Sequence, residues 1–234
     1  MTHVRSILIY LIGIPIFLLL AGITIVLSIL GGSYRFDPLI KFFCRLILGI
    51  FGIRVDRIMN GHLDPKRTYL FMCNHVNMFD SFVLNGYLPN LTRGVELDSH
   101  FRWPIWGTVI RKFGNIPISH HNTKSAIESL KQAQAALEDG TSIIILPEGH
   151  RTRDGKLRTF MKGPFHLAKN ACATIVPLAM VGAFEIKQVQ SLLLRPGTVH
   201  FRIGEPIPYD NYQHMKVNEL RDLIREKIEQ LMVV

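Results

Sequence analysis

The sequence predicts an α/β fold, a mostly parallel central sheet flanked by helices, preceded by an N-terminal helical unit suited to docking on a membrane. From residue 53 onward, short apolar runs typical of buried strands alternate with longer segments of helical periodicity. Before residue 53, two apolar segments contain few charged residues. We therefore expect residues 1–52 to form a membrane anchor or interfacial helical hairpin, and residues 53–234 to form the α/β domain.

The first apolar segment runs from Ile7 to Leu30 without a charged residue. As a helix it would be about 36 Å long, enough to cross a hydrocarbon layer of about 30 Å with some tilt. The run is too long for a typical signal-peptide core and is followed by no small-x-small cleavage pattern, so we expect a retained anchor. We expect this helix to break at Gly31-Gly32.

The second apolar segment, Leu39 to Phe51, places Lys41 and Arg45 on one helical face. It is short for a membrane span, so we interpret it as an interfacial helix or the return arm of a hairpin; a buried core helix is the alternative. Basic residues follow the first helix, and the positive-inside rule then places the α/β domain on the cytoplasmic side of an inner or plasma membrane. Whether the first helix spans or re-enters the bilayer stays open.

Charge and cysteine content narrow the choice of partners. A formal net charge of +9 suits an anionic membrane, a phosphorylated substrate or nucleic acid. No arginine-rich arm with interleaved aromatic residues and no zinc-finger spacing is present, so we expect no nucleic-acid partner. The three cysteines, Cys44, Cys73 and Cys172, are unpaired in spacing and are predicted to be buried without forming disulfides.

In the α/β domain, predicted strands and helices alternate. Strands are expected at residues 53–58, 69–73, 115–118, 142–146, 173–178 and 198–203, and helices at residues 103–113, 123–138, 162–170 and 216–231. This alternation predicts a parallel sheet covered on both faces, with chemistry in the turns that follow the strands.

His75 follows the strand at residues 69–73, and Asp80 stands five residues later. On one continuous helix, five residues would point the two side chains roughly 140° apart. They can meet only if His75 lies in a turn and Asp80 in the first turn of the next helix, for which Asn77 is the predicted N-cap. A carboxylate beside an imidazole fixes its tautomer, as a general base requires. The spacing alone would also fit a surface or capping histidine.

A second polar stretch, residues 147–153, leaves the strand at residues 142–146. Gly149 permits a left-handed turn there. Arg151 and Arg153 offer planar guanidinium groups that suit phosphate oxygens, and Glu148 can accept a hydrogen bond from a hydroxyl. A solvated basic loop is the alternative interpretation.

Four motifs in this order resemble those of the glycerolipid acyltransferases, the family typified by lysophosphatidic acid acyltransferase. The resemblance covers about residues 40–210. The matching segments are His75-x4-Asp80 after Asn74, residues 114–120, residues 147–151 and residues 175–179, with Lys162-Gly163 behind the third motif.

The resemblance implies that residues 53–234 form the acyltransferase domain of a membrane-bound O-acyltransferase. Such an enzyme moves a fatty acyl group from acyl-CoA or acyl-carrier protein to the free hydroxyl of a lysophospholipid, with lysophosphatidic acid the favoured acceptor and phosphatidic acid the product. His75 would take the hydroxyl proton, and Asp80 would hold His75. The implied substrate-binding residues are Glu148, Gly149, Arg151, Arg153, Lys162 and His120. The acyl thioester is a co-substrate; we expect no further cofactor and no metal.

Departures from the family pattern leave the acceptor open. His120 stands where an arginine usually ends the second motif, His150 replaces a threonine in the third, and Asn77 stands where serine is common in the first. A phospholipid diester or an aminolipid is the alternative acceptor. A catalytically silent lipid-binding protein is the alternative from another class. A membrane-anchored serine or cysteine hydrolase is a remote alternative because no Gly-x-Ser-x-Gly segment is present.

Overall fold

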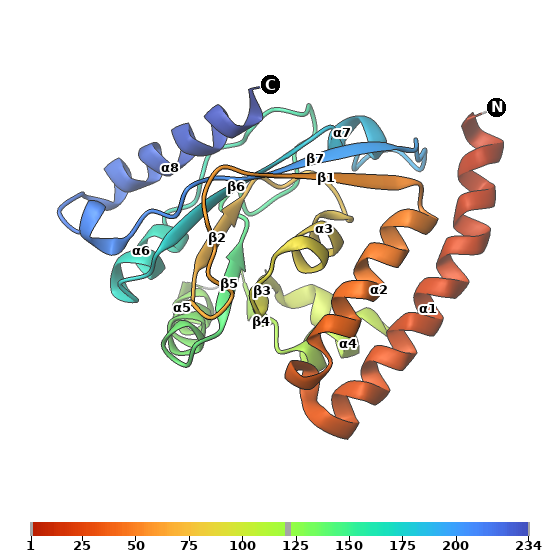
Figure 1. Ribbon diagram of the computed structural model, residues 1–234, viewed down its shortest axis with the longest axis horizontal. Coiled ribbons are helices and arrows are strands. Elements are labelled where there is room, and N and C mark those ends of the chain that lie inside the picture. The colour runs from red at the N-terminus through yellow and green to blue at the C-terminus, as the bar shows by residue number, and fades with distance from the viewer. Residues whose placement is uncertain (1, 120–122, 234) are drawn as a thin grey trace.

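A seven-stranded sheet with the order β1-β7-β6-β2-β5-β3-β4 forms the centre of the computed structural model, which describes residues 2–119 and 123–233 (Figure 1). Neighbouring strands are parallel except β6 and β7, which pair antiparallel. The predicted mostly parallel sheet is therefore confirmed. The strands are β1 (Ile53–Met59), β2 (Leu70–Cys73), β3 (Thr92–Leu97), β4 (Ile116–Ile118), β5 (Ser142–Ile145), β6 (Ile175–Val181) and β7 (Gly197–Ile203).

Helices cover both faces of the sheet, with α5, α6 and α8 on one side and α1 to α4 on the other (Figure 1). The α-helices are α1 (Thr2–Arg35), α2 (Asp37–Ile50), α3 (Asp80–Tyr87), α4 (Trp106–Phe113), α5 (Thr123–Glu138), α6 (Gly163–Asn170), α7 (Ala183–Ile186) and α8 (Val217–Met232), and the 3-10 helices are η1 (Asp98–Arg102) and η2 (Tyr209–Asn211).

Strand β2 shows why a central parallel strand needs a continuous apolar run. Phe71 and Cys73 pack into the core beneath α2 and α3, whereas Leu70 and Met72 pack into the core with α5, α6 and α8. All four side chains are fully buried. Because both faces of the strand are covered, the alternation of polar and apolar residues seen in half-exposed strands is lost.

The expected break at Gly31-Gly32 is wrong, because α1 continues to Arg35. Glycine lowers helix stability by only about 1 kcal/mol relative to alanine, so a pair of glycines does not by itself end a helix. The chain turns at Phe36 instead, and Pro38 in the first turn of α2 fixes the new direction. Gly31 allows close packing here, since a Cβ on it would lie 3.0 Å from the Phe36 ring.

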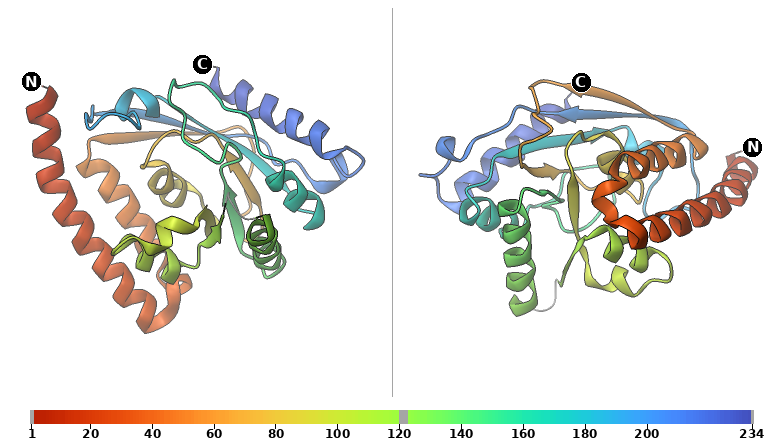
Figure 2. Two further views of the ribbon diagram at one scale, coloured as in Figure 1. Left: turned by 180° about the vertical axis from the view of Figure 1, so that it is seen from behind. Right: turned by 60° about the horizontal axis from the view of Figure 1, so that its bottom comes forward.

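Helix α1 lies alongside the α/β domain and does not point away from it (Figure 2). Near its start, the Ser6 hydroxyl donates to the carbonyl oxygen of Leu194 and accepts from the N–H of the same residue. Further along, Phe17 packs against Phe82 and Trp106. The opposite face of the helix is apolar and open: Leu11, for example, is 66% exposed.

Candidate active site

His75 and Asp80 meet across the turn between β2 and α3, as the spacing predicts. His75 lies in the turn, Asp80 is the first residue of α3, and Nδ1 of His75 lies 2.7 Å from Oδ2 of Asp80. The Asp80 carboxylate, 1% exposed, also accepts from the backbone N–H of Val76 (2.7 Å) and of Asn77 (3.1 Å). With the Nδ1 proton directed at Asp80, Nε2 of His75 is left with the lone pair that a base needs.

Asn77 does not serve as the predicted N-cap, because the cap position of α3 is Phe79. Its Oδ1 accepts from the N–H of Phe79 (2.8 Å), which shapes the turn before the helix. Its Nδ2 donates to the carbonyl oxygens of Ala183 (2.8 Å) and Lys187 (3.2 Å). The side chain therefore fastens the His75 turn to α7, a long-range role that a local capping rule does not foresee.

Asn74 fixes the direction in which the chain leaves β2. Its Nδ2 donates to the carbonyl oxygen of Met180 (3.1 Å), and its Oδ1 accepts from the N–H of the same residue (2.8 Å). The amide side chain thus replaces a pair of backbone hydrogen bonds to β6 after the β2–β6 ladder ends. This arrangement frees the backbone of residues 74–76 to turn and present His75.

Glu148 connects the His75 turn to the loop that follows β5. Its Oε1 accepts from the N–H of His75 (2.7 Å) and its Oε2 from the N–H of Arg158 (2.7 Å). The side chain is 4% exposed, and this burial raises the pKa of Glu148 although both N–H groups act to lower it. Both oxygens are engaged within the protein, which differs from the substrate contact that the resemblance implies.

A cavity of about 620 Å³ opens at the edge of the sheet where β2, β5, β3 and β4 end. Since these strands are parallel, the turns after them converge there. The cavity is lined by His75 after β2, Arg151 after β5, His100 after β3 and Ser119 after β4. It is the main candidate for a substrate-binding site.

Only some of the predicted site residues line this cavity. His75, Gly149 and Arg151 line it, and Asp80 lies behind His75. Arg153 and Lys162 are exposed and are not among its lining residues. His120 lies outside the described residues.

The loop after β5 carries Arg151 into the cavity through a sharp turn. Gly149 has φ +70°, the left-handed conformation predicted for it, and its N–H donates to the carbonyl oxygen of Leu146. The N–H of Thr152 donates to the carbonyl oxygen of His75 (2.9 Å), which joins this loop to the His75 turn. Within the described part of the chain, Arg151 forms no hydrogen bond or ion pair, so its guanidinium is available to an anion.

A polar network around Glu96 also faces the cavity, and it was not predicted from the sequence. The Glu96 carboxylate accepts from Nδ1 of His100 (3.0 Å), Nε1 of Trp106 (3.0 Å) and Nδ2 of Asn115 (3.2 Å). Burial acts to raise the pKa of Glu96, but the hydrogen bonds and the charge of His100 outweigh burial and hold that pKa below its usual value. A signal was present, since His100 follows Glu96 by four residues, but β3 itself was not predicted.

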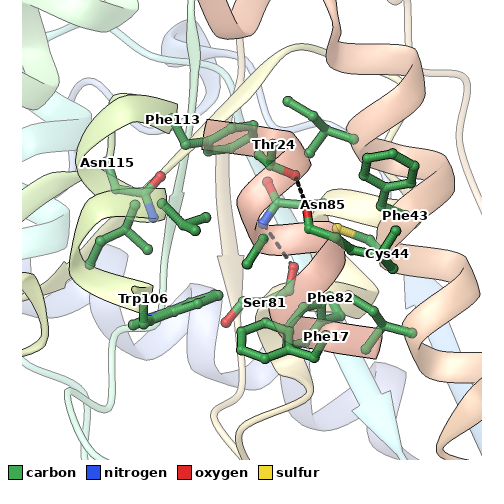
Figure 3. Close-up of a pocket in the computed structure, with 16 residues that line it drawn as sticks. Phe17, Thr24, Phe43, Cys44, Ser81, Phe82, Asn85, Trp106, Phe113 and Asn115 are labelled. Carbon is green, nitrogen blue, oxygen red and sulfur yellow. Dashed lines mark hydrogen bonds between the residues drawn. The ribbon is translucent and has the colours of Figure 1, made fainter. Parts of the chain in front are cut away.

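A smaller apolar pocket of about 70 Å³ lies between α1, α2, α3 and α4 (Figure 3). The rings of Phe17, Phe82 and Trp106 form part of its wall. Ser81, Asn85 and Asn115 line both this pocket and the larger cavity. The two spaces are therefore neighbours separated by three small polar side chains.

Two further predictions concern metal ligands and cysteines. Among residues 2–119 and 123–233, no group of three His, Cys, Asp or Glu residues could hold a metal ion. Cys44 and Cys73 are buried as predicted, and burial raises the pKa of the Cys73 thiol well above its usual value. The prediction for Cys172 is wrong: it is exposed, in the turn that follows α6.

A family model described as Acyltransferase matches residues 56–181. The matched segment begins within β1 and ends with β6. It therefore contains the His75 turn, Asp80, the network around Glu96 and the loop that carries Arg151.

Several curated relatives have the printed name 1-acyl-sn-glycerol-3-phosphate acyltransferase. The protein of Cocos nucifera is 30% identical over 181 residues, which cover 77% of this chain and 58% of that protein. The protein of Arabidopsis thaliana chloroplasts is 27% identical over 230 residues, which cover 91% of this chain and 64% of that protein. The chain thus spans about three fifths of the length of these relatives.

The crystal structure of 1-acyl-sn-glycerophosphate acyltransferase from Thermotoga maritima has the same fold. The TM-score is 0.84, and the match covers 98% of this chain and 95% of that one. The sequence identity is 20%, so this likeness supports the fold alone.

Proposed function

The chain belongs to the acyltransferase family, and from that premise we propose that it transfers a fatty acyl group from an acyl thioester to the free hydroxyl of a lysophospholipid, with lysophosphatidic acid as the acceptor. The observation that carries this proposal is the 2.7 Å contact between Nδ1 of His75 and Asp80, on the wall of a cavity large enough for reacting groups of two substrates. The names of the curated relatives support the choice of acceptor.

The chemistry follows from the free Nε2 of His75. This nitrogen takes the proton of the acceptor hydroxyl while the oxygen attacks the carbonyl carbon of the thioester. The carbon–sulfur bond then breaks, and the thiolate leaves as a thiol with the proton from His75. The products are an ester and the free thiol of CoA or of a carrier protein. Asp80 orients the ring and stabilises the imidazolium between the two proton transfers.

The proposed acceptor places its phosphate near Arg151, whose planar guanidinium can bind two phosphate oxygens at once. An acyl chain bound with its carbonyl at His75 can extend past Ser81, Asn85 and Asn115 into the apolar pocket. We assign Glu148 to positioning the His75 turn rather than to holding the acceptor, because both its oxygens accept backbone hydrogen bonds.

We further propose that the enzyme is membrane-bound through α1 and α2, with the catalytic domain facing the cytoplasm and its soluble donors. Among the described residues, one helical stretch, His3–Gly31, is long and apolar enough to cross a membrane. Its contacts favour a helix that lies along the bilayer surface, since Ser6 and Phe17 both pack against the same domain. A spanning helix would carry one end about 30 Å away from that domain.

Acyl transfer by the purified full-length chain in mixed micelles tests the proposed function. The assay uses one acyl-CoA, or acyl-carrier protein, with lysophosphatidic acid, a lysophospholipid diester and a lyso-aminolipid. Transfer to lysophosphatidic acid that disappears in His75→Ala supports the proposal. Preference for the diester or the aminolipid would mean that this lipid, and not lysophosphatidic acid, is the acceptor. Transfer to none with either donor would favour the silent lipid-binding protein.

A further inference from the structure

The catalytic cavity contains a second histidine that is held in the same way as His75. Nδ1 of His100 lies 3.0 Å from Oε1 of Glu96, just as Nδ1 of His75 lies 2.7 Å from Asp80. In both pairs the carboxylate fixes Nδ1 and leaves Nε2 for another partner. We propose that His100 is a phosphate-binding residue, whose Nε2 donates a hydrogen bond to a phosphate oxygen of a substrate in the cavity. This inference rests on the proposed function for the identity of the substrate.

Glu96 itself is fully engaged and acts through His100. Its carboxylate accepts from His100, Trp106 and Asn115, and Oδ1 of Asn115 in turn accepts from the N–H of Gly94 (3.0 Å). The carboxylate therefore cannot rotate toward a ligand without leaving three donors unpaired. Such a supported arrangement holds the His100 ring ready before the ligand arrives.

The topology brings His100 close to the other candidate phosphate ligand. His100 follows β3 and Arg151 follows β5, and these two strands pair in parallel. The strand on the other side of β5 is β2, which carries His75 at its end. Strand β5, which leads to the Arg151 loop, thus lies between β2, which leads to His75, and β3, which leads to His100.

The charges around the cavity favour an anion next to His100. Glu96 is the only carboxylate among the described lining residues. The other lining groups that can carry positive charge are His75, His150, Arg151 and His166, and the uncharged ring of Trp103 packs against His100 at 4.4 Å between centroids. When an imidazole donates through both nitrogens, to a carboxylate and to a phosphate, each hydrogen bond is charge-assisted.

The experiment measures binding without turnover, in full-length protein that carries His75→Ala. Dissociation constants are determined in detergent micelles for lysophosphatidic acid and for a monoacylglycerol with the same acyl chain, which lacks only the phosphate. Adding His100→Gln is expected to weaken lysophosphatidic acid binding about tenfold and to change monoacylglycerol binding less than twofold.

A second pair of probes identifies which substrate supplies the phosphate. CoA carries phosphates and pantetheine does not. Weaker binding of CoA alone in His100→Gln would assign the phosphate to the donor, and weaker binding of lysophosphatidic acid alone would assign it to the acceptor. Unchanged binding of both phosphorylated ligands would overturn the inference, as would equal losses for lysophosphatidic acid and monoacylglycerol, which would indicate a packing role.

Companion variants keep the result interpretable. His200→Gln is the matched control: Nδ1 of His200 lies 3.1 Å from Asp56, but that pair is exposed and does not line the cavity. His100→Lys restores a cation and is expected to recover part of the phosphate-dependent affinity, whereas Glu96→Gln is expected to lose it with the ring still present. If His100→Gln fails to fold, these two variants decide the question.

The same design separates this inference from the proposed reaction. Phosphate-dependent binding that disappears in His100→Gln, combined with no acyl transfer by the unmodified protein, would retain the inference and reject the reaction. Acyl transfer by the unmodified protein, combined with phosphate-dependent binding that is unchanged in His100→Gln, would retain the proposed reaction and reject the inference.

Discussion

The backbone N–H of His75 donates a 2.7 Å hydrogen bond to Oε1 of Glu148. The second oxygen of that carboxylate holds the N–H of Arg158, ten residues further along the chain. The position of the His75 ring therefore depends on a buried carboxylate that follows a different strand, β5. A substitution at Glu148 is expected to act on the geometry of the base more than on substrate affinity.

Glu148→Gln leaves one of these two backbone N–H groups without an acceptor. We expect the free energy of unfolding to fall by roughly 2 kcal/mol and kcat to fall at least about tenfold, while the KM for the acceptor changes less than about twofold. Denaturant unfolding and steady-state kinetics measure both effects, with the exposed Glu185→Gln as control. A raised acceptor KM at unchanged stability would instead place Glu148 against the acceptor.

His75 and Asp80 are expected to differ in how much they contribute to stability. His75→Ala should lower kcat by roughly 10²–10⁴-fold and leave thermal unfolding nearly unchanged, because the backbone contacts of residue 75 remain. Asp80→Ala should lose activity and also about 2–4 kcal/mol of stability, because it leaves His75 Nδ1 and the N–H groups of Val76 and Asn77 without their acceptor. Equal melting temperatures for the two variants would contradict this account.

Arg151→Ala should raise the KM for a phosphorylated acceptor by roughly tenfold to a hundredfold and spare the KM for acyl-CoA. The physical reason is the loss of a charge-assisted, two-pronged contact from a side chain that the protein otherwise leaves unpaired among its described residues. Arg151→Lys should recover part of the affinity, since lysine restores the positive charge but not the planar guanidinium that binds two phosphate oxygens. Arg54→Ala, an exposed position on β1, is the control. An effect on the donor KM alone would reverse the assignment.

Leu11→Glu combined with Leu19→Glu tests the exposed apolar face of α1. These side chains are 66% and 63% exposed, so charges there are compatible with the fold but not with burial in lipid. Each leucine contributes roughly 1.5–3 kcal/mol when buried in an apolar phase, so retention on vesicles should fall at least about tenfold. Co-sedimentation measures it, with Val233→Glu at the far end of the chain as control. Full retention would show that α1 does not hold the protein on the membrane.

Cysteine labelling distinguishes a surface helix from a spanning helix. Cys172 is exposed and is replaced by serine in the background, whereas Cys44 and Cys73 are buried. Val4→Cys and Leu30→Cys then place one thiol near each end of α1. In a surface helix both ends lie on the same side of the bilayer, so an impermeant maleimide added outside sealed vesicles should label the two thiols equally, weakly while this face is in lipid and fully after detergent is added. Labelling of one end alone before detergent would indicate a span.

Glu96→Gln should destabilise the protein in a pH-dependent way. The folded protein holds the pKa of Glu96 below its ordinary value of 4.5, so ionised Glu96 favours folding at pH values above 4.5. This contribution is lost as the pH falls below 4.5 through the lowered folded pKa. Urea unfolding at several pH values should show a deficit of about 1–3 kcal/mol at pH 7 that shrinks below pH 4.5. A deficit that stays constant with pH would mean that the charge of Glu96 does not contribute.

The sequence predicted the sheet through its buried strands, because a run such as residues 70–73 can be satisfied only with cover on both faces. It missed β3, where Arg93 and Glu96 break the apolar pattern. These charges are satisfied by tertiary contacts, the ring of Phe113 for Arg93 and the His100 network for Glu96. The hydrophobic periodicity of the sequence gives no information about such tertiary contacts.

The candidate site, like the sheet, was predictable from the sequence only in part. The meeting of His75 and Asp80 follows from spacing and helix geometry, and the left-handed turn at Gly149 follows from residue type. The contacts of Asn77 with α7 and of Glu148 with Arg158 depend on segments that lie far apart or on a loop with no regular pattern. A residue type suggests a chemical role, but only the fold shows whether its polar atoms are already occupied.

The hydrogen bonds between Ser6 and Leu194 join residues 188 positions apart. At a synthesis rate of about 5–20 residues per second, Ser6 is added to the chain roughly 10–40 s before Leu194. The segment Ile7–Leu30 of α1 has no charged residue, and an apolar helix of this length is more stable in a bilayer than in water throughout that interval. On the membrane association proposed above, lipid binds α1 before Leu194 is available to Ser6, and the α/β domain then completes its folding against a helix that the membrane already holds.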